Sequence, residues 1–327
     1  METKELIRLT GVNSGIAGKR AARKSFAEFL EKKGLLAAPE ETDIHKVVCI
    51  DYSSKYKYQV NNPRLGRENR TLVRMEPSVV LPANFSRSRR NQFGLKVTVG
   101  GNPTGSSATV HWPLVFPSET DLAVLHAAGR LDLAVLINGN KMSFVKGELY
   151  SLRRRAIRAL DNLDVFGTEW DSKFTQRLFI AIRSFTHSCL SLKLPHMQGA
   201  SMWFQSYPKS FRTVDDKLAA MSKYKYALVI ENSAEYMSEK LMEALFAGCI
   251  PVYVGPNPQE YGIPKDIVIW TNPNIASIEN SFREAATWRF DEFQARLSLF
   301  LQSSATRELW DHERVHQRLL DLIQGNK

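Results

Sequence analysis

The chain has 327 residues, which is enough for two domains of ordinary size, each with its own core. Its hydrophobic content of 43% and charged content of 24% are those of a folded globular protein and exclude a largely disordered one. The formal net charge of +10 indicates attraction to anionic partners, which include phosphorylated substrates, anionic lipids and nucleic acid.

Several classes of protein are not expected from the rest of the sequence. It has no apolar run of about 18 residues, and charges interrupt its N-terminal stretch, so neither a membrane span nor a signal peptide is predicted. The expected location is therefore the cytoplasm. Cys49, Cys189 and Cys249 lie far apart in apolar runs, which is typical of buried thiols. No RNA-binding motif or paired Cys/His finger accompanies the basic clusters, so nucleic acid is not an expected partner.

Residues 1–43 are a basic segment whose fold the sequence leaves unassigned. Within it, residues 19–33 (KRAARKSFAEFLEKK) have the pattern of a basic amphipathic helix with Phe26, Phe29 and Leu30 on one side. Such a helix either rests on an anionic membrane, which would make the protein peripheral at the inner face of that membrane, or packs on the protein through the same apolar residues. The sequence leaves both interpretations open.

Residues 44–160 are predicted to form a first α/β domain. Glu76 follows an expected strand and precedes Pro77, so a fixed turn is predicted at the end of that strand. Most glutamates in such positions are surface residues. His111, in HWPLVFP, is a second candidate base because an unperturbed imidazole titrates at about pH 6.5, although its surroundings are typical of packing. The expected strands are 46–51, 72–75, 95–99 and 132–137, and the expected helix is 149–160.

Residues 161–327 are predicted to form a second α/β domain, with a strand at 163–166, a helix at 175–192 and a helical tail from 280 to 324. Residues 224–256 have the pattern of a β-α-β unit with a polar turn after its first strand and a left-handed glycine, Gly248, at the end of its helix. Ligands of parallel sheets lie beyond the carboxyl ends of the strands, so this turn is the predicted ligand site. Its candidate residues are Asn232, Ser233, Tyr236, Ser238, Glu239 and Lys240.

Lys240 is the unusual residue of this turn. The helix macrodipole disfavours a cation in the first turn of a helix, so an anionic ligand would explain Lys240 better than solvation does. Glu239, by contrast, suits a helix N-terminus for stability alone. Spacing and charge therefore predict a site for a phosphate-bearing ligand.

From Glu231 onward the chain reads ENSAEYMSEKLMEALFAGCIPVYVGP. This run resembles the donor-binding signature of the α-1,3-fucosyltransferases (glycosyltransferase family 10), whose pattern is roughly F-E-N-S, a short variable loop, Y-[IV]-[ST]-E-K and A-G-x-[IV]-P-[IV]-x-x-G. The chain departs from that pattern in one respect, because only residues 233–235 separate Asn232 from Tyr236, which is a shorter loop than the family usually carries.

The resemblance extends in less detail to the first half of the chain. Residues 163–167 (LDVFG) are similar to a strand of the family, and the family arginine that precedes this strand across a short helix corresponds to Arg153, with Arg154 as the alternative. Asn138, in NGNK, is similar to the asparagine of a turn between the domains. Glu76 matches the Glu-Pro or Glu-x-Pro element that supplies the proposed general base of the family.

The resemblance implies an α/β chain of GT-B architecture, in which two Rossmann-like domains enclose a cleft and the C-terminal domain binds the nucleotide sugar. It implies an inverting transfer of fucose from GDP-fucose to a hydroxyl of a glycan or lipid-linked glycan acceptor. Arg153 and Lys240 would neutralise the diphosphate, and Glu76 would deprotonate the acceptor. The sequence has no D-x-D pair, so no metal or other cofactor is expected.

Two alternatives remain open. The first is a GT-B glycosyltransferase that uses a different nucleotide sugar, because the A-G-x-I-P element recurs in other such enzymes. The second is a non-catalytic α/β protein that binds a nucleotide or a polyanion. Glu76 together with Glu239 and Lys240 favours an enzyme, since a binding protein needs no base. The absence of a G-x-G-x-x-G fingerprint argues against an NAD-dependent dehydrogenase.

Overall fold

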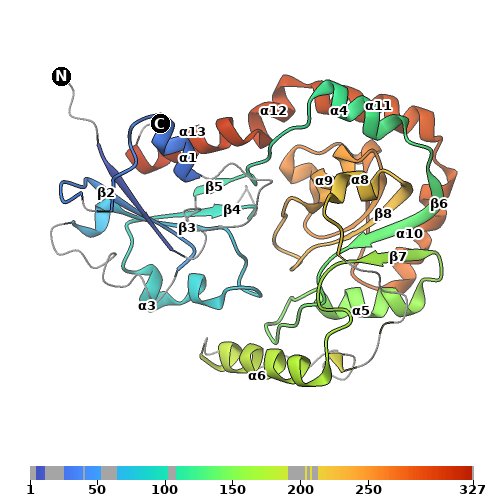
Figure 1. Cartoon of the computed structure of the whole chain (residues 1–327), viewed down its shortest axis with the longest axis horizontal. Helices are drawn as coiled ribbons and strands as arrows, with labels where there is room; N and C mark the ends of the chain where they lie inside the picture. Colours follow the sequence, from blue (N-terminus) through green and yellow to red (C-terminus); the bar gives the residue numbers. More distant parts are fainter. Residues whose placement is uncertain are drawn as a thin grey trace. The chain divides into compact units, whose positions relative to one another are not determined.

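The computed structural model describes residues 5–11, 26–39, 41–52, 65–101, 108–190, 203–204, 207 and 213–325. They form two compact units, each built on its own parallel sheet (Figure 1). The first unit comprises Met1–Val115 and Arg307–Lys327, and the second comprises Phe116–Thr306. Within the described ranges, no helix combines the length and the apolar character that crossing a lipid bilayer requires.

The sheet of the first unit has five parallel strands in the order β1-β2-β3-β4-β5. Val47, Val48 and Leu72 are fully buried, as expected of parallel strands that are covered on both faces. The strands predicted at 46–51, 72–75 and 95–99 are confirmed, whereas the sequence pattern did not predict the short β1 and β5. The five strands are β1 (Ile7–Thr10), β2 (Lys46–Ile50), β3 (Arg70–Arg74), β4 (Leu95–Val99) and β5 (Ala108–Val110).

Helix α1 (Phe26–Lys32) packs on the first unit through the apolar residues of the basic segment. Phe26 and Leu30 are buried, and the rings of Phe26 and Phe29 each lie 5.5 Å from the ring of His316 on α13 (His312–Gln324). The structure therefore favours packing over membrane contact for this part of the segment. Residues 12–25, which include the start of the predicted helix at 19–33, lie outside the described residues.

The sheet of the second unit has five parallel strands in the order β10-β9-β8-β6-β7. The chain runs from β6 to β7 on one side, and then returns to β8 on the other side of β6. This reversal between β6 and β8 is a topological switch point, where open α/β sheets bind ligands beyond the carboxyl ends of their strands. The strands are β6 (Leu131–Ile137), β7 (Leu163–Phe166), β8 (Tyr224–Ile230), β9 (Ile250–Val254) and β10 (Ile269–Trp270).

Polar side chains begin several helices of the second unit. Ser118 accepts a hydrogen bond from the backbone nitrogen of Asp121, and Asp216 and Asn274 cap later helices in the same way. The predicted helix at 149–160 and the helical tail are confirmed, and the helix predicted at 175–192 is confirmed as far as residue 190, with 191–192 outside the described residues. The helices are α4 (Glu119–Ala127), α5 (Tyr150–Ala159), α6 (Phe174–Leu190), α8 (Lys217–Met221), α9 (Lys240–Phe246), α10 (Ile275–Thr287), α11 (Phe290–Gln302) and α12 (Ser304–Trp310), which leads back to the first unit.

The division of the chain differs from the boundary expected at residue 160. Strand β6 and helix α5 belong to the second unit, because β6 is hydrogen-bonded to β7 and β8. The last residues, 307–327, return to the first unit, where Trp310 and Leu319 are buried. An apolar strand pattern does not show which sheet a strand joins. The prediction therefore assigned β6 to the first domain, together with the strands that precede it along the chain.

Candidate functional site

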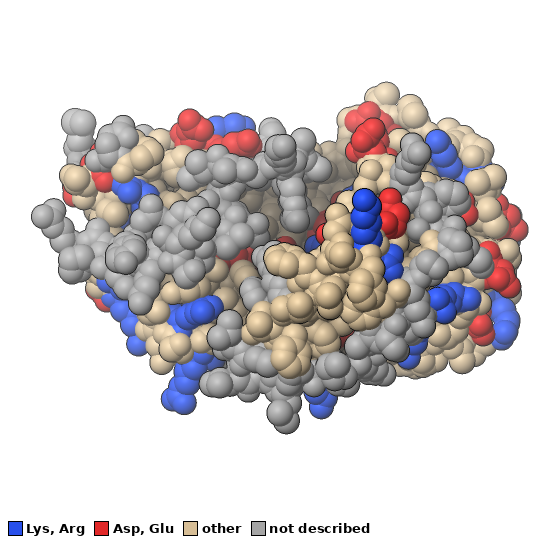
Figure 2. Space-filling model, turned by 60° about the horizontal axis from the view of Figure 1, so that its bottom comes forward, with Lys and Arg blue, Asp and Glu red and all other residues tan. Residues whose placement is uncertain are grey.

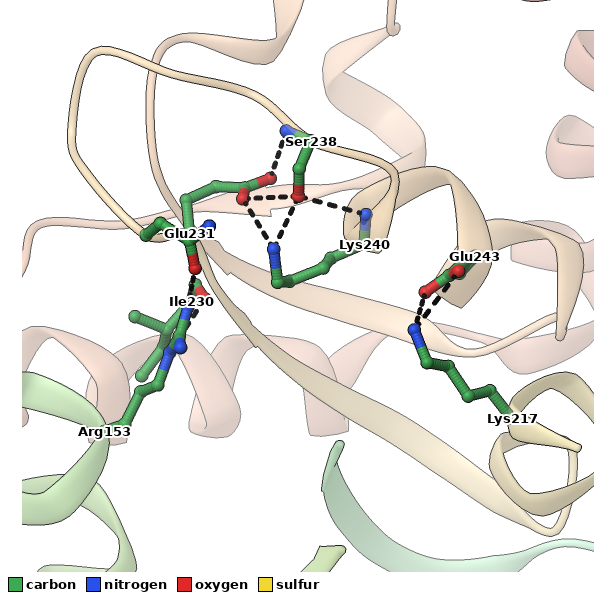
Figure 3. Close-up of polar contacts among 8 residues, drawn as sticks. Arg153, Lys217, Ile230, Glu231, Ser238, Lys240 and Glu243 are labelled. Carbon is green, nitrogen blue, oxygen red and sulfur yellow. Dashed lines mark hydrogen bonds and ion pairs between the residues drawn. The ribbon is translucent and has the colours of Figure 1, made fainter. Parts of the chain in front are cut away.

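The polar turn after β8 is organised around Glu231, a carboxylate that lies in the signature but was not among the predicted site residues (Figure 3). Glu231 has no exposed surface, and its Oε1 accepts a hydrogen bond from the Ser238 backbone nitrogen at 2.9 Å. Its Oε2 accepts a bond from Ser238 Oγ at 2.7 Å and pairs with Lys240 Nζ at 3.3 Å. Glu231 thus ties the end of β8 to the start of α9. The feature of the sequence that could have identified Glu231 as a site residue is its position, since it is a charged residue directly after a buried apolar strand.

Lys240 is the first residue of α9, as expected, but the structure supplies an internal anion for it. Its Nζ donates to Ser238 Oγ at 2.6 Å as well as pairing with Glu231, and 17% of its side chain is exposed. The Glu231 carboxylate offsets the unfavourable macrodipole, so the position of Lys240 does not by itself require an anionic ligand. An ammonium has three N–H donors, so a third remains beside these two acceptors.

Arg153 reaches the same strand end from α5 (Figure 3). It is buried, its Nε and Nη2 donate to the Ile230 carbonyl at 3.2 and 2.6 Å, and Nη2 also donates to Asn232 Oδ1 at 3.0 Å. Burial lowers the pKa of Arg153, while Tyr150 and Glu231 oppose that shift. The structure therefore brings together Arg153 and Asn232, two predicted donor-binding residues, and shows that Arg153 holds the end of β8.

Arg154 and Asn138 shape the loop that follows β6. Arg154 is buried, its Nη1 donates to the Lys141 carbonyl at 2.7 Å, and its guanidinium lies 5.5 Å from the centre of the Trp203 ring. Asn138 is also buried, and its carbonyl accepts a hydrogen bond from Trp170 Nε1 at 2.6 Å. Both residues therefore make structural contacts beside the carboxyl end of β6.

Ser233, Tyr236 and Glu239 complete the predicted set. Ser233 and Tyr236 are buried, and Ser233 forms backbone bridges with Tyr236 and with Glu148, which lies just before α5. Glu239 occupies the N-cap of α9. Burial, and then the charge of Glu239, raise the pKa of the Glu243 carboxyl. The loop is thus joined to α5 on one side and to α9 on the other.

The backbone conformation or the close surroundings require glycine at two positions between α9 and the end of β9. Gly248 follows α9 with a φ of +72°, the left-handed conformation that its position predicted. A Cβ atom on Gly255 would lie 2.3 Å from the Tyr253 hydroxyl and 2.8 Å from Cγ of Glu231. A side chain at position 255 would therefore displace Tyr253 or Glu231, and the Glu231 network depends on Gly255.

Glu76 follows β3 in the first unit, in a turn that a second buried carboxylate organises. Asp51 is fully buried with a φ of +57°, and its Oδ1 accepts bonds from the backbone nitrogens of Met75 at 2.8 Å and Glu76 at 3.1 Å. Asn84 Nδ2 donates to the same oxygen at 2.6 Å and to the Glu76 carbonyl at 3.3 Å. The main chain of Glu76 is thus held on both sides, as the predicted fixed turn requires.

His111 lies against a tryptophan of the same unit. Its ring meets the Trp310 ring at a centroid distance of 4.8 Å and an angle of 73°, and Trp310 is buried. This contact is the packing that its surroundings in the sequence indicated, so Glu76 stays the first candidate for a base.

Cysteines and metal ligands add little to the site. Cys49 and Cys249 are buried free thiols, as predicted, and the side chain of Cys189 lies outside the described residues. In the part of the chain that the structure describes, no three His, Cys, Asp or Glu residues are grouped so that they could hold a metal ion.

Comparison with known proteins gives one short sequence match. No protein-family model matches the chain. A putative fucosyltransferase-like protein of Arabidopsis thaliana is 43% identical over 54 residues, which are 16% of this chain and only 10% of that relative.

Solved structures are similar over almost the whole chain. The sucrose-phosphate synthase of Thermosynechococcus elongatus has a TM-score of 0.56 and 13% identity, covering 98% of this chain and 99% of that one. HepE of Anabaena, solved in complex with UDP and glucose, has a TM-score of 0.52 and 10% identity, covering 98% and 100%. An α1,3-fucosyltransferase structure has a TM-score of 0.46 and 12% identity over 99% and 92%, which is too low to carry an argument. Two five-stranded parallel sheets with their helices thus give this chain the GT-B fold that the sequence resemblance implied.

Proposed function

We propose that the protein is a glycosyltransferase that moves a sugar from a nucleoside diphosphate to a hydroxyl of a glycan or lipid-linked glycan. The observation that carries this proposal is the loop 231–240, which lies at the switch point of the second sheet and has the residue order of a nucleotide-sugar signature. We assign GDP-fucose as the donor, because run 231–256 resembles the α-1,3-fucosyltransferase signature. The short match to a fucosyltransferase-like relative supports the same assignment.

In the proposed reaction the second unit binds the leaving diphosphate. Lys240 is already held by Ser238 and Glu231, so little side-chain freedom is lost when its remaining N–H meets a phosphate oxygen. Asn232 accepts a bond from Arg153 through Oδ1 and keeps its amide nitrogen as a donor to the ligand. We assign Arg153 a positioning role, because it is buried and donates to Ile230 and Asn232.

Glu76 of the first unit is the proposed general base. In an inverting transfer, the base takes the proton of the acceptor hydroxyl while its oxygen attacks the anomeric carbon and the bond to the diphosphate breaks. The backbone bonds of Glu76 to Asp51 and Asn84 restrict the turn that carries it, which is what a positioned base needs.

A calorimetric titration with GDP, UDP and heparin tests the proposal against its alternatives. We expect GDP to bind at least about tenfold more tightly than UDP, a difference of roughly 1.4 kcal/mol. Tighter binding of UDP would indicate a different nucleotide sugar, and binding of heparin alone would indicate a polyanion-binding protein. Release of GDP from GDP-fucose, stimulated by a glycan acceptor, would then establish transfer.

Replacing Lys240 with Ala should weaken GDP binding by about 1.5–3 kcal/mol, the range for a hydrogen bond to a charged group. Titration calorimetry measures the loss. Lys225→Ala is the matched control, because Lys225 lies at the other end of β8 and is likewise ion-paired, to Asp132 at 3.3 Å. Thermal unfolding of both variants shows whether they are folded. If folded Lys240→Ala binds GDP like the parent, the diphosphate lies elsewhere.

Catalysis is expected to be independent of divalent metal ions. The sequence has no D-x-D pair, and Lys240 can stabilise the leaving diphosphate in place of a cation. Initial rates measured with and without EDTA should therefore agree. Loss of activity in EDTA that manganese restores would contradict this prediction.

A further inference from the structure

Arg74 is a buried cation at the carboxyl end of β3, two residues before Glu76. Only 7% of its surface is exposed, and its Nη2 donates to Thr98 Oγ1 on β4. Its guanidinium lies 5.0 Å from the centre of the ring of Phe85, in the short helix η3 (Pro82–Phe85). A cation over a ring uses the flat face of the guanidinium, so the N–H groups at its edge stay available to a ligand.

Arg90 is the second cation at this place. It ends the short helix α3 (Arg87–Arg90), which begins one residue after η3. Asn84 of η3 donates to the Glu76 carbonyl at 3.3 Å, so this segment is fastened to the turn that follows β3. Burial, and then the charge of Arg90, lower the pKa of Arg74. The two guanidinium groups are therefore close enough to repel each other.

No carboxylate pairs with either arginine in the described part of the chain. The Nε atoms of Arg74 and Arg90 are buried without a hydrogen-bond partner there. The nearby Asp51 uses its Oδ1 to accept main-chain N–H groups and the Asn84 amide. Residues 53–64 and 102–107, which follow β2 and β4 in the sequence, contain no Asp or Glu. Burying cations without a counter-charge costs folding free energy, and an anionic ligand would offset that cost.

The surface around α3 is basic as well. Helix α3 lies at the bottom of the first unit in Figure 1, and Figure 2 turns this part toward the viewer. Most of the charged side chains in view on that part are Lys or Arg. Arg89 of α3 lies 5.0 Å from the centre of the Tyr52 ring, just beyond the end of β2. An approaching anion thus meets a positive field at these strand ends.

We propose that Arg74 and Arg90 bind a phosphate group carried by the acceptor. A guanidinium can meet phosphate through two parallel N–H···O bonds. Two uncompensated cations suit the charge of a phosphate monoester, about −1.5 to −2 at neutral pH, better than the single charge of a carboxylate. Parallel sheets bind ligands at this edge, where Glu76 also lies. The phosphate site rests on the first unit alone, and only its assignment to the acceptor rests on the proposed function.

Thermal unfolding in rising concentrations of inorganic phosphate, at constant ionic strength, tests the site. Every chain in this experiment carries Lys240→Ala, so that the donor loop adds no phosphate binding. Phosphate should raise the midpoint of unfolding, and acetate should not. Adding Arg90→Gln should weaken phosphate binding by at least about tenfold, because one of two charged partners is lost. Without phosphate, Arg90→Gln should not lower the midpoint, since the repulsion of Arg74 is removed.

Arg87→Gln is the matched control, because Arg87 is an exposed arginine of the same helix. It removes the same charge and should leave phosphate binding unchanged. The phosphate site is overturned if phosphate does not raise the midpoint, or if acetate raises it equally. It is also overturned if Arg90→Gln binds phosphate like the control.

The assignment to the acceptor is measured separately, with Lys240 intact. At saturating donor, inorganic phosphate should raise the KM of the acceptor that supports GDP release and leave kcat unchanged, and Arg90→Gln should abolish this inhibition. Turnover without such inhibition would overturn the assignment. A parent that binds phosphate through Arg90 but does not bind GDP would contradict the proposed function and leave the phosphate site standing.

Discussion

Replacing Glu76 with Gln should lower kcat by about 10²–10⁴-fold, the usual contribution of a positioned general base, while GDP affinity stays near that of the parent. Glutamine keeps the shape of the side chain but cannot take the acceptor proton. The recorded hydrogen bonds of Glu76 to Asp51 and Asn84 use its main chain, so the substitution leaves them intact. GDP release under saturating donor and acceptor measures kcat, and calorimetry measures the affinity.

Glu68→Gln is the matched control for this experiment. Glu68 is an exposed glutamate of the same unit, two residues before β3, and its substitution should change neither kcat nor GDP binding. Turnover of Glu76→Gln at the parental rate would show that Glu76 is not the base, and His111→Asn would then be measured in the same assay. A fall in GDP affinity equal to the fall in kcat would instead indicate a disturbed fold.

Replacing Glu231 with Ala should lower the free energy of unfolding by about 3–5 kcal/mol, the range for removing one partner of a buried ion pair. The change leaves Lys240 without its carboxylate, and it leaves the Ser238 backbone nitrogen without its acceptor. Urea denaturation, followed through both its midpoint and its slope, measures the loss. The loop 231–240 also loses the hydrogen bonds and the ion pair of Glu231 that hold it, so GDP binding should fall as well.

Asp132→Ala removes an exposed ion pair and serves as the comparison for Glu231→Ala, which removes a buried one. Asp132 pairs with Lys225 at 3.3 Å, but its side chain is 80% exposed, so its removal should cost less than about 1 kcal/mol. A double substitution, Glu231→Ala with Lys240→Met, should be less destabilising than the sum of the two single changes, because no unpaired charge remains. Equal effects of Glu231→Ala and Asp132→Ala would show that the buried network does not stabilise the unit.

The local elements could be predicted from the sequence because they depend on short-range patterns. The apolar run after Tyr224 indicates a buried strand, and the spacing of Leu241, Ala244 and Leu245 indicates a helix. Gly248 marks the end of that helix, and the structure confirms its left-handed conformation. Parallel strands place their carboxyl ends at one edge, so the polar loop after β8 could be predicted as the candidate ligand site.

Contacts between distant segments could not be predicted in the same way. The sequence pattern placed Lys240 beside an expected ligand, whereas the folded chain places it beside Glu231. The macrodipole argument treats a helix in isolation, and it omits charges that another strand brings close. Arg153 illustrates the same point, because its partners Ile230 and Asn232 are more than seventy residues further along the chain, at separations of 77 and 79.

The sequence by itself thus determined most of the helices and strands and the loop that is the candidate donor site, because periodicity, turn residues and helix ends act over a few residues. Only the tertiary structure decided that β6 joins the second sheet, that 307–327 return to the first unit, and that α6 keeps an exposed apolar face. Each of these depends on which surfaces meet after folding. An apolar pattern shows that a side chain can be buried. Whether the side chain is buried, and by which residues, depends on packing between segments that are distant in the sequence.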